Sequence, residues 1–160
     1  MEMTLHGDPA VKLNRHTKPD YAIRNEDLIC KTDIYPDSIG INLNIYNLAR
    51  AISDSFRVVI TRTFPDGSKE MFIDTVNAPY YKTTLSYFIP LNPDKGAGLN
   101  YFNAVIDDIN RIDEEDNTIN NKTGNIPLLI NGNDIVPVYP YEFEVLPIAS
   151  SIKLKASSVD

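Results

Sequence analysis

The 160-residue sequence contains no tryptophan, one cysteine and only seven glycines, and each scarcity narrows what the chain can be. A single cysteine forms neither an intramolecular disulfide nor a cysteine-rich metal site, so the redox compartment stays undetermined. The low glycine content and the 42% of apolar residues exclude a fibrous or disordered chain. We therefore expect an ordinary globular protein with one buried core, since domains usually hold on the order of 100 to 150 residues.

Long apolar runs and basic clusters are also missing. The longest apolar runs, such as VVI and IPLLI, are far shorter than the roughly 20 residues that a membrane-spanning helix requires. The 22 acidic and 15 basic residues give a formal net charge of -7, and no run of Lys or Arg would follow a phosphate backbone. Nucleic acid and membrane insertion are therefore not expected.

Alternating apolar residues predict strands in the middle of the chain. Residues 39–45 (IGINLNI) place four aliphatic side chains on one face and polar or small residues on the other. Residues 56–64 (FRVVITRTF) repeat this pattern, except that Arg62 interrupts the apolar row. We expect this second strand to leave the core before its end.

Turn residues separate the predicted strands. In FPDGSKEMF, Pro65 presets φ and Gly67 accepts a left-handed conformation, so residues 69–77 should run back antiparallel to residues 56–64. GAGLN predicts a later turn. No window of a dozen residues has a helical period of 3.6. The sequence predicts an all-β fold, an immunoglobulin-like two-sheet β-sandwich of about seven strands. Its other strands are predicted at residues 19–33, 83–89, 101–107 and 125–130.

The acidic stretch IDDINRIDEEDNTINN, residues 106–121, is the part of the chain that most resembles a chemical site. An EF-hand calcium loop needs oxygen ligands at alternating positions, a central glycine and a final glutamate. If Asp108 starts such a loop, Asn110 fits, but Ile112 occupies a ligand position and Ile119 stands where the glutamate belongs. The EF-hand interpretation therefore fails.

Two further chemical interpretations of this stretch have less support than a solvated loop without a chemical role. A looser calcium site would use Asp107, Asn110 and Glu114. A glycosidase-type pair needs two carboxylates facing each other across a cleft, whereas Glu114, Glu115 and Asp116 are consecutive, and water best relieves their repulsion. We favour a solvated loop, and we expect no catalytic, cofactor-binding or metal-binding residue.

In the favoured interpretation the stretch connects the last two strands of the sandwich. Ile106 and Ile112 would point into the core, Asp107 and Asn110 would form the turn, and residues 120–121 would lead the final strand.

Nucleophilic catalysis has little support. Cys30 with His6 or His16 is the available nucleophile and base, but a cysteine between Ile29 and Lys31 in a strand is typical of a small core residue. No nucleophile elbow and no phosphate-binding loop are present.

Tyrosines are the remaining candidates for ligand contact, because surface tyrosines stack on sugars and anchor protein partners. Packing within the sandwich is the alternative role. NKT at residues 121–123 is a formal glycosylation sequon. The candidate set is Tyr80, Tyr81, Tyr87, Tyr101, Tyr139 and Tyr141.

The start of the chain, MTLHGDPAVKL at residues 3–13, resembles the closing segment of gingipain-type cysteine peptidase domains. The resemblance implies that the catalytic residues of such a peptidase lie upstream, because neither Cys30 nor His16 occupies a matching motif. The matching positions are Gly7, Asp8, Pro9, Ala10 and Leu13.

The middle of the chain, roughly residues 20–131, resembles the bacterial adhesion-related immunoglobulin-like (CARDB-like) modules. IGINLNIYNLA at residues 39–49 carries the first part of the resemblance. The second acidic residue that these modules carry shortly before Asn-Asn has no clean counterpart. The later matching positions are Ile106, Asp107, Asn110, Ile112, Glu114, Asn120 and Asn121.

Together the two resemblances imply a domain organisation. Residues 1–18 would be the tail of an upstream peptidase domain, residues 19–134 the sandwich, and residues 135–160 a linker with the first strand or strands of a following module. Within the last part, residues 150–158 look like the start of a strand. The chain would then be a piece of a longer protein, so the lack of a secretory signal in its first residues does not argue against secretion.

The implied function is a non-catalytic spacer or adhesion module of a large secreted or cell-surface bacterial protein, downstream of a gingipain-type peptidase domain. Its partners would be neighbouring domains of the same polypeptide and a cell-surface protein or glycan. No cofactor is expected, and calcium is the one candidate ion. The alternative is a module that binds a glycan or protein ligand through exposed tyrosines and loops.

Overall fold

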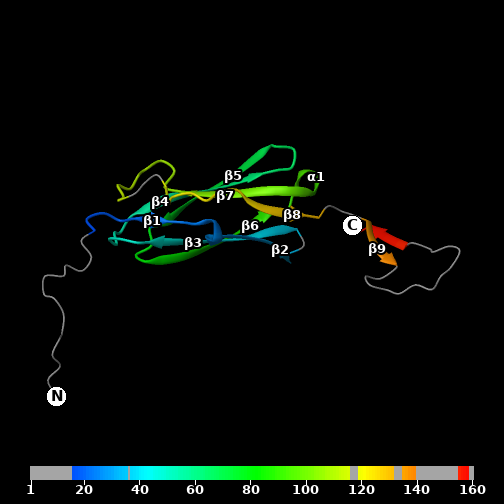
Figure 1. Cartoon of the computed structure of the whole chain (residues 1–160), viewed down its shortest axis with the longest axis horizontal. Coiled ribbons are helices and arrows are strands. Elements are labelled where there is room, and N and C mark those ends of the chain that lie inside the picture. Colours follow the sequence, from blue (N-terminus) through cyan, green and yellow to red (C-terminus); the bar gives the residue numbers. More distant parts are fainter. Residues whose placement is uncertain (1–15, 36, 116–118, 132–134, 140–154, 159–160) are drawn as a thin grey trace, which may run out of the picture.

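Two antiparallel sheets face each other across an apolar core in the computed structural model (Figure 1). The first sheet contains β1 (Tyr21–Ala22), β2 (Leu28–Tyr35), β3 (Ser38–Asn47) and β6 (Lys82–Pro90). The second contains β4 (Ser55–Thr63), β5 (Lys69–Asn77), β7 (Gly98–Ile106) and β8 (Ile126–Ile130). The structure describes residues 16–35, 37–115, 119–131, 135–139 and 155–158.

The pairing of the strands defines the fold class. In the first sheet β6 pairs along one edge of β3, while β1 and β2 pair with successive parts of its other edge. The second sheet has the order β5-β4-β7-β8. β5, the strand that follows β4, therefore joins the second sheet. In the constant-type immunoglobulin arrangement, the corresponding fourth strand belongs to the first sheet. The predicted all-β, immunoglobulin-like two-sheet sandwich is confirmed.

In the described part of the chain, four short elements lie outside these two sheets. The 3-10 helix η1 (Asn25–Asp27) separates β1 from β2, and α1 (Pro93–Gly96) precedes β7. No helix in the described part of the chain is long and apolar enough to cross a membrane. A separate sheet pairs β9 (Ile135–Tyr139) with β10 (Lys155–Ser158), so the strand expected within residues 150–158 is present at its end.

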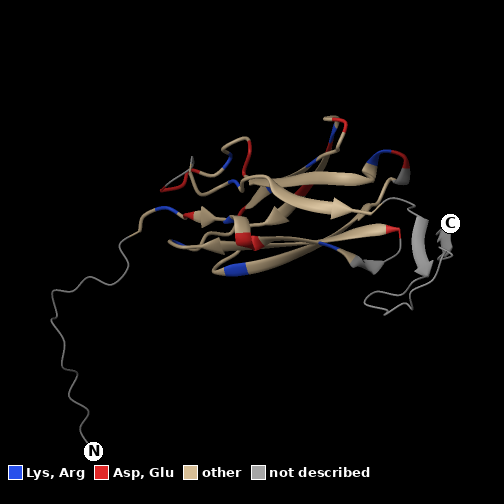
Figure 2. Ribbon diagram, turned by 45° about the vertical axis from the view of Figure 1, so that its right-hand side comes forward, with Lys and Arg blue, Asp and Glu red and all other residues tan. Residues whose placement is uncertain are grey.

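The alternation in β3 and β4 builds the centre of the core. The four aliphatic residues of β3 that were predicted to face inward, from Ile39 to Ile45, are at most 1% exposed. Phe56, Val58 and Ile60 of β4 are buried to the same degree. Burial of each large apolar side chain stabilises the fold by about 2 kcal/mol, so these two strands contribute a large part of the packing between the sheets. Most charged residues lie at the turns and ends instead (Figure 2).

The predicted hairpin between β4 and β5 is also confirmed. Gly67 has a φ of 83°, and its N–H donates to the carbonyl of Phe64 at 2.9 Å. The N–H of Phe64 donates to the carbonyl of Ser68, also at 2.9 Å. The turn fixes a register in which Thr63 pairs with Lys69.

The prediction that β4 leaves the core before its end is wrong, because Arg62 is 0% exposed. Nε donates to Oδ1 of Asn100 at 3.0 Å, and the two terminal nitrogens donate to the carbonyls of Pro90 and Leu91 at 2.9 Å each. The guanidinium also stacks over the ring of Phe64 at 4.3 Å. A buried cation thus joins the end of β4 to the connection between β6 and β7.

The space for this guanidinium depends on a glycine in α1. A Cβ at Gly96 would collide with the carbonyl oxygen of Leu91 and would lie 2.6 Å from Nη2 of Arg62. Asn100 supports the same connection, since its Nδ2 donates to the carbonyls of Gly96 at 2.7 Å and Gly98 at 3.0 Å. The predicted turn through GAGLN is wrong for its last three residues. β7 begins at Gly98, because Gly98 already pairs with Ile130 of β8.

Candidate functional site

The acidic connection, residues 107–121, begins with a turn built around a buried carboxylate. Asp107 and Asn110 have φ values of 47° and 49°, and the N–H of Asn110 donates to the carbonyl of Asp107 at 2.9 Å. The two carboxylate oxygens of Asp107 accept hydrogen bonds from the N–H groups of Arg111 and Ile112, both at 2.9 Å. The prediction that Asp107 and Asn110 form the turn is confirmed.

The two isoleucines of this region also lie where they were predicted. Ile106 is 0% exposed and Ile112 is 3% exposed, and both belong to the core cluster. The stretch therefore connects β7 to β8 as expected, with its apolar residues directed inward.

Glu114 is buried as well, at 4% exposure. Its Oε2 accepts a hydrogen bond from the N–H of Tyr21 at 2.7 Å, and its Oε1 accepts one from Nδ2 of Asn121 at 2.9 Å. Burial raises the pKa of Glu114 to about 7, and the two hydrogen bonds offset this rise only in part. The expected solvated loop is therefore wrong for Asp107 and Glu114, whose carboxylates are held inside the protein.

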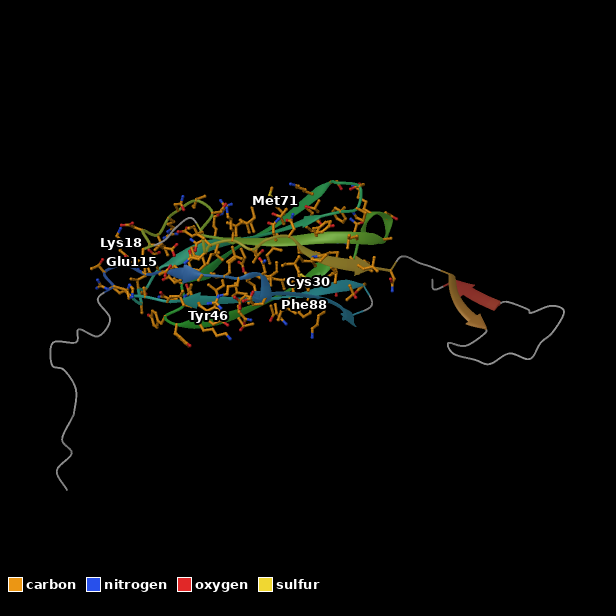
Figure 3. The ribbon with its side chains drawn as sticks, in the orientation of Figure 1. Lys18, Cys30, Tyr46, Met71, Phe88 and Glu115 are labelled. Atoms are coloured by element: carbon orange, nitrogen blue, oxygen red, sulfur yellow. The ribbon has the colours of Figure 1, made fainter. Side chains whose placement is uncertain are left out.

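The acidic connection holds the segment by which the chain enters the sandwich, here called the incoming segment (residues 16–20). Oε1 of Glu115 accepts hydrogen bonds from the N–H groups of Thr17 at 3.2 Å and Lys18 at 3.4 Å. Nζ of Lys18 forms an ion pair with Asp113 at 2.8 Å, which raises the pKa of Lys18. Figure 3 shows Lys18 and Glu115 together at one end of the sandwich.

Further contacts extend this arrangement into β1. Nδ2 of Asn120 donates to Oδ1 of Asp20 at 2.7 Å, and the N–H of Ile23 donates to the carbonyl of Asn120 at 2.8 Å. From the other side, the N–H of Leu48 donates to the carbonyl of Asp20 at 2.7 Å. We call five residues of the acidic connection the clamp. Asp113, Glu114, Glu115 and Asn120 contact residues 17–23, and Asn121 donates a hydrogen bond to Glu114.

The looser calcium site does not form an open ligand set. All four carboxylate oxygens of Asp107 and Glu114 accept hydrogen bonds from protein N–H groups, and Asn110 is exposed. Within the described ranges, no group of three His, Cys, Asp or Glu side chains is arranged to hold a metal ion. These hydrogen bonds fix the turn and the clamp. Asp116 lies outside the described residues.

The cysteine and histidine candidates are not brought together. Cys30 pairs with Ile41 in the first sheet and packs partly buried against the core, and burial raises the pKa of its thiol to about 12. Nδ1 of His16 lies 4.0 Å from Oε1 of Glu115, at the end of the sandwich away from Cys30 (Figure 3). The packing role predicted for Cys30 is confirmed. His6 lies outside the described residues.

The candidate tyrosines have different environments. Tyr80 is 67% exposed, Tyr81 is 73% exposed and Tyr101 is 38% exposed. The side chains of Tyr139 and Tyr141 lie outside the described part of the chain. Tyr87 in β6 is partly buried against the core.

Two surface cavities each contain one of these tyrosines. Asp74 was not among the predicted site residues, although it interrupts an inward-facing row in β5 between two apolar residues, a pattern visible in the sequence. The first cavity, of about 350 Å³, is lined by Ser53, Asp54, Asn77, Ala78 and Tyr80. The second, of about 280 Å³, is lined by Val58, Ile60, Phe72, Ile73, Asp74 and Tyr87.

The first residue of the glycosylation sequon belongs to the clamp. Asn121 is 5% exposed, and its Nδ2 donates to Glu114. Oγ1 of Thr123 accepts a hydrogen bond from the N–H of Ala104 at 2.9 Å. Folding therefore withdraws the nitrogen to which a glycan would be attached.

Fold and site together define an immunoglobulin-like sandwich in which the acidic connection binds the incoming segment through hydrogen bonds and an ion pair. A scan against protein-family models found no match, and no curated protein matches the chain. Among solved structures, the chain is similar to the CARDB domain of the PF1109 protein from Pyrococcus furiosus, determined in complex with di-metal ions. The TM-score is 0.52 at 15% identity, and the similarity covers 78% of this chain and 98% of that chain. At this identity the likeness shows a shared fold.

Proposed function

We propose that the chain acts as a non-catalytic spacer or adhesion module within a larger secreted or cell-surface bacterial protein. The observation that carries this proposal is the placement of the two chain connections. The incoming segment lies at one end of the long axis of the sandwich, and β8 leads away at the opposite end (Figure 1). Such an in-line arrangement separates whatever precedes the module from whatever follows it.

The clamp supports the same role. A spacer transmits a defined direction only if its connection to the preceding module is fixed. Here the carboxylate of Glu115 and the ion pair between Asp113 and Lys18 hold the incoming segment against the sandwich. These carboxylates bind backbone and side-chain donors of the same chain, so no catalytic step and no resident cofactor is required of them.

The suggested neighbours follow from the sequence. The resemblance of residues 3–13 to the end of gingipain-type peptidase domains supports a peptidase domain upstream. The fold shared with a CARDB domain supports the adhesion-module class.

The clamp can be tested with Glu115→Ala. Loss of this carboxylate removes the acceptor for the N–H groups of Thr17 and Lys18, so their backbone order parameters should fall from about 0.85 to below about 0.6. The sandwich should stay folded. Glu26→Ala is the matched control, because Glu26 is an exposed acid paired with Arg24 at 3.9 Å. Unchanged nuclear-spin relaxation at residues 17–18 in the Glu115 variant would contradict the clamp.

A glycan-binding module is the second candidate, and the cavity at Tyr80 favours it. An exposed aromatic ring beside carboxylate, amide and hydroxyl groups is the combination that stacks on and hydrogen-bonds to a sugar. On a glycan array, Tyr80→Ala should weaken the binding of any glycan that the natural sequence binds by about tenfold. Tyr81→Ala is the control, since Tyr81 is exposed but does not line the cavity. An array without a single bound glycan would remove this candidate and leave the spacer.

A further inference from the structure

The second cavity opens between the two sheets, where the edge strands β5 and β6 lie on the same side of the sandwich. Its floor is formed by Val58 and Ile60, which belong to the core and are 1% exposed. Two aromatic rings, those of Phe72 and Tyr87, form walls from opposite sheets. The cavity is thus an apolar recess that reaches the core from the side.

One carboxylate lies in this recess. Oδ1 of Asp74 accepts a hydrogen bond from the N–H of Thr75 at 2.8 Å, and Oδ2 accepts one from the hydroxyl of Tyr87 at 3.1 Å. Burial and the neighbouring carboxylate raise the pKa of Tyr87, so this hydroxyl keeps its proton. Among the described residues no Lys, Arg or His forms an ion pair with Asp74.

This combination selects a particular ligand chemistry. A carboxylate beside two aromatic faces attracts a positive charge, through Coulomb attraction and through the ring quadrupoles. The aliphatic floor stabilises a hydrocarbon body by the area that it removes from water. An anion would be repelled by Asp74, and a neutral apolar molecule would bury that carboxylate without neutralising it.

We propose that this cavity is a binding site for an organic ammonium group carried on an apolar body. At about 280 Å³ it lies at the small end of ligand sites, so the apolar body has roughly ten non-hydrogen atoms. The charge meets Asp74, the hydrocarbon packs on Val58 and Ile60, and the rings flank both. A free amine and a lysine side chain of another polypeptide share this chemistry.

The experiment uses phenethylamine and its uncharged counterpart phenethyl alcohol as ligands, followed by the methyl NMR shifts of Val58, Ile60 and Ile73. Phenethylamine should produce saturable shifts at these methyl groups and should bind about fivefold more tightly than the alcohol. In Asp74→Asn this preference should disappear, while the amide can still accept the hydrogen bond from Tyr87. A thermal melt confirms that the variant is folded.

Asp94→Asn is the matched control. It removes the same charge from α1, which does not line the cavity, so the amine preference should remain. Equal binding of amine and alcohol to the natural sequence, or equal loss in both variants, would overturn the proposal. So would the absence of shifts with both ligands.

A second pair of ligands distinguishes the sources of the ammonium group. Blocked Val-Lys-Val is compared with blocked Val-norleucine-Val, in which the ammonium group is missing. Tighter binding of the lysine peptide than of phenethylamine would support a polypeptide partner, and the reverse order a small amine. If neither charged ligand binds more tightly than its uncharged counterpart, the site does not recognise ammonium groups.

Discussion

Replacing Arg62 with alanine is expected to lower the free energy of unfolding by about 4 kcal/mol. The change removes a cation that is 0% exposed and leaves three acceptors, on Asn100, Pro90 and Leu91, without their donors inside the protein. It also leaves a cavity beside the ring of Phe64. Urea unfolding followed by circular dichroism measures the effect.

Two further variants make this result interpretable. Arg62→Met restores most of the volume but none of the donors, so it should still cost about 2 kcal/mol. Arg24→Ala removes an exposed arginine that has only a 3.9 Å ion pair, and it should change stability by less than about 0.5 kcal/mol. If Arg62→Met proved as stable as the natural sequence, packing and not hydrogen bonding would explain the burial of this arginine.

The second large effect expected is a loss of stability with rising pH that depends on Glu114. Its pKa in the folded state is raised to about 7, whereas the ordinary value is 4.5. Between these values the folded protein holds a proton that the unfolded chain releases. The stabilisation is therefore fully present below the unfolded pKa and is lost as the pH rises through about 7.

This linkage amounts to about 2 kcal/mol between pH 5 and pH 8. Urea unfolding at both pH values should show the natural sequence more stable at pH 5, and Glu114→Gln should remove that part of the difference. Glu26→Gln removes an exposed carboxylate and should leave the difference intact. A Glu114 variant with the full pH dependence of the natural sequence would assign the effect to other groups.

The strands could be predicted because their signal is local. The row from Ile39 to Ile45 has a period of two, and Pro65 with Gly67 specifies a tight turn whatever the rest of the chain does. The failure at Arg62 is different in kind. Its acceptors are the carbonyls of Pro90, at the end of β6 in the other sheet, and of Leu91 in the connection that follows. No local pattern in β4 predicts a partner that far along the chain.

The acidic connection shows the same limit. Charged side chains are almost never buried unless they are paired, so composition favours a solvated loop. Glu114 is buried because the N–H of Tyr21, far away in the sequence, meets its carboxylate. One local signal was available: Ile112, predicted to face inward, lies two residues before Glu114, and so does Phe72 before Asp74. A carboxylate two residues after an inward-facing apolar side chain indicates a buried acid or a recess.

The opposite placement of the two chain connections has a mechanical consequence. If neighbouring modules are pulled apart, the load runs along β1 at one end and along β8 at the other (Figure 1). These strands belong to different sheets, and their ladder hydrogen bonds lie across the direction of pull. The bonds of each terminal strand then share the load and must break together instead of opening one after another. The clamp adds the bonds of Glu114 and Glu115 to those of β1 at the end where the chain enters the sandwich.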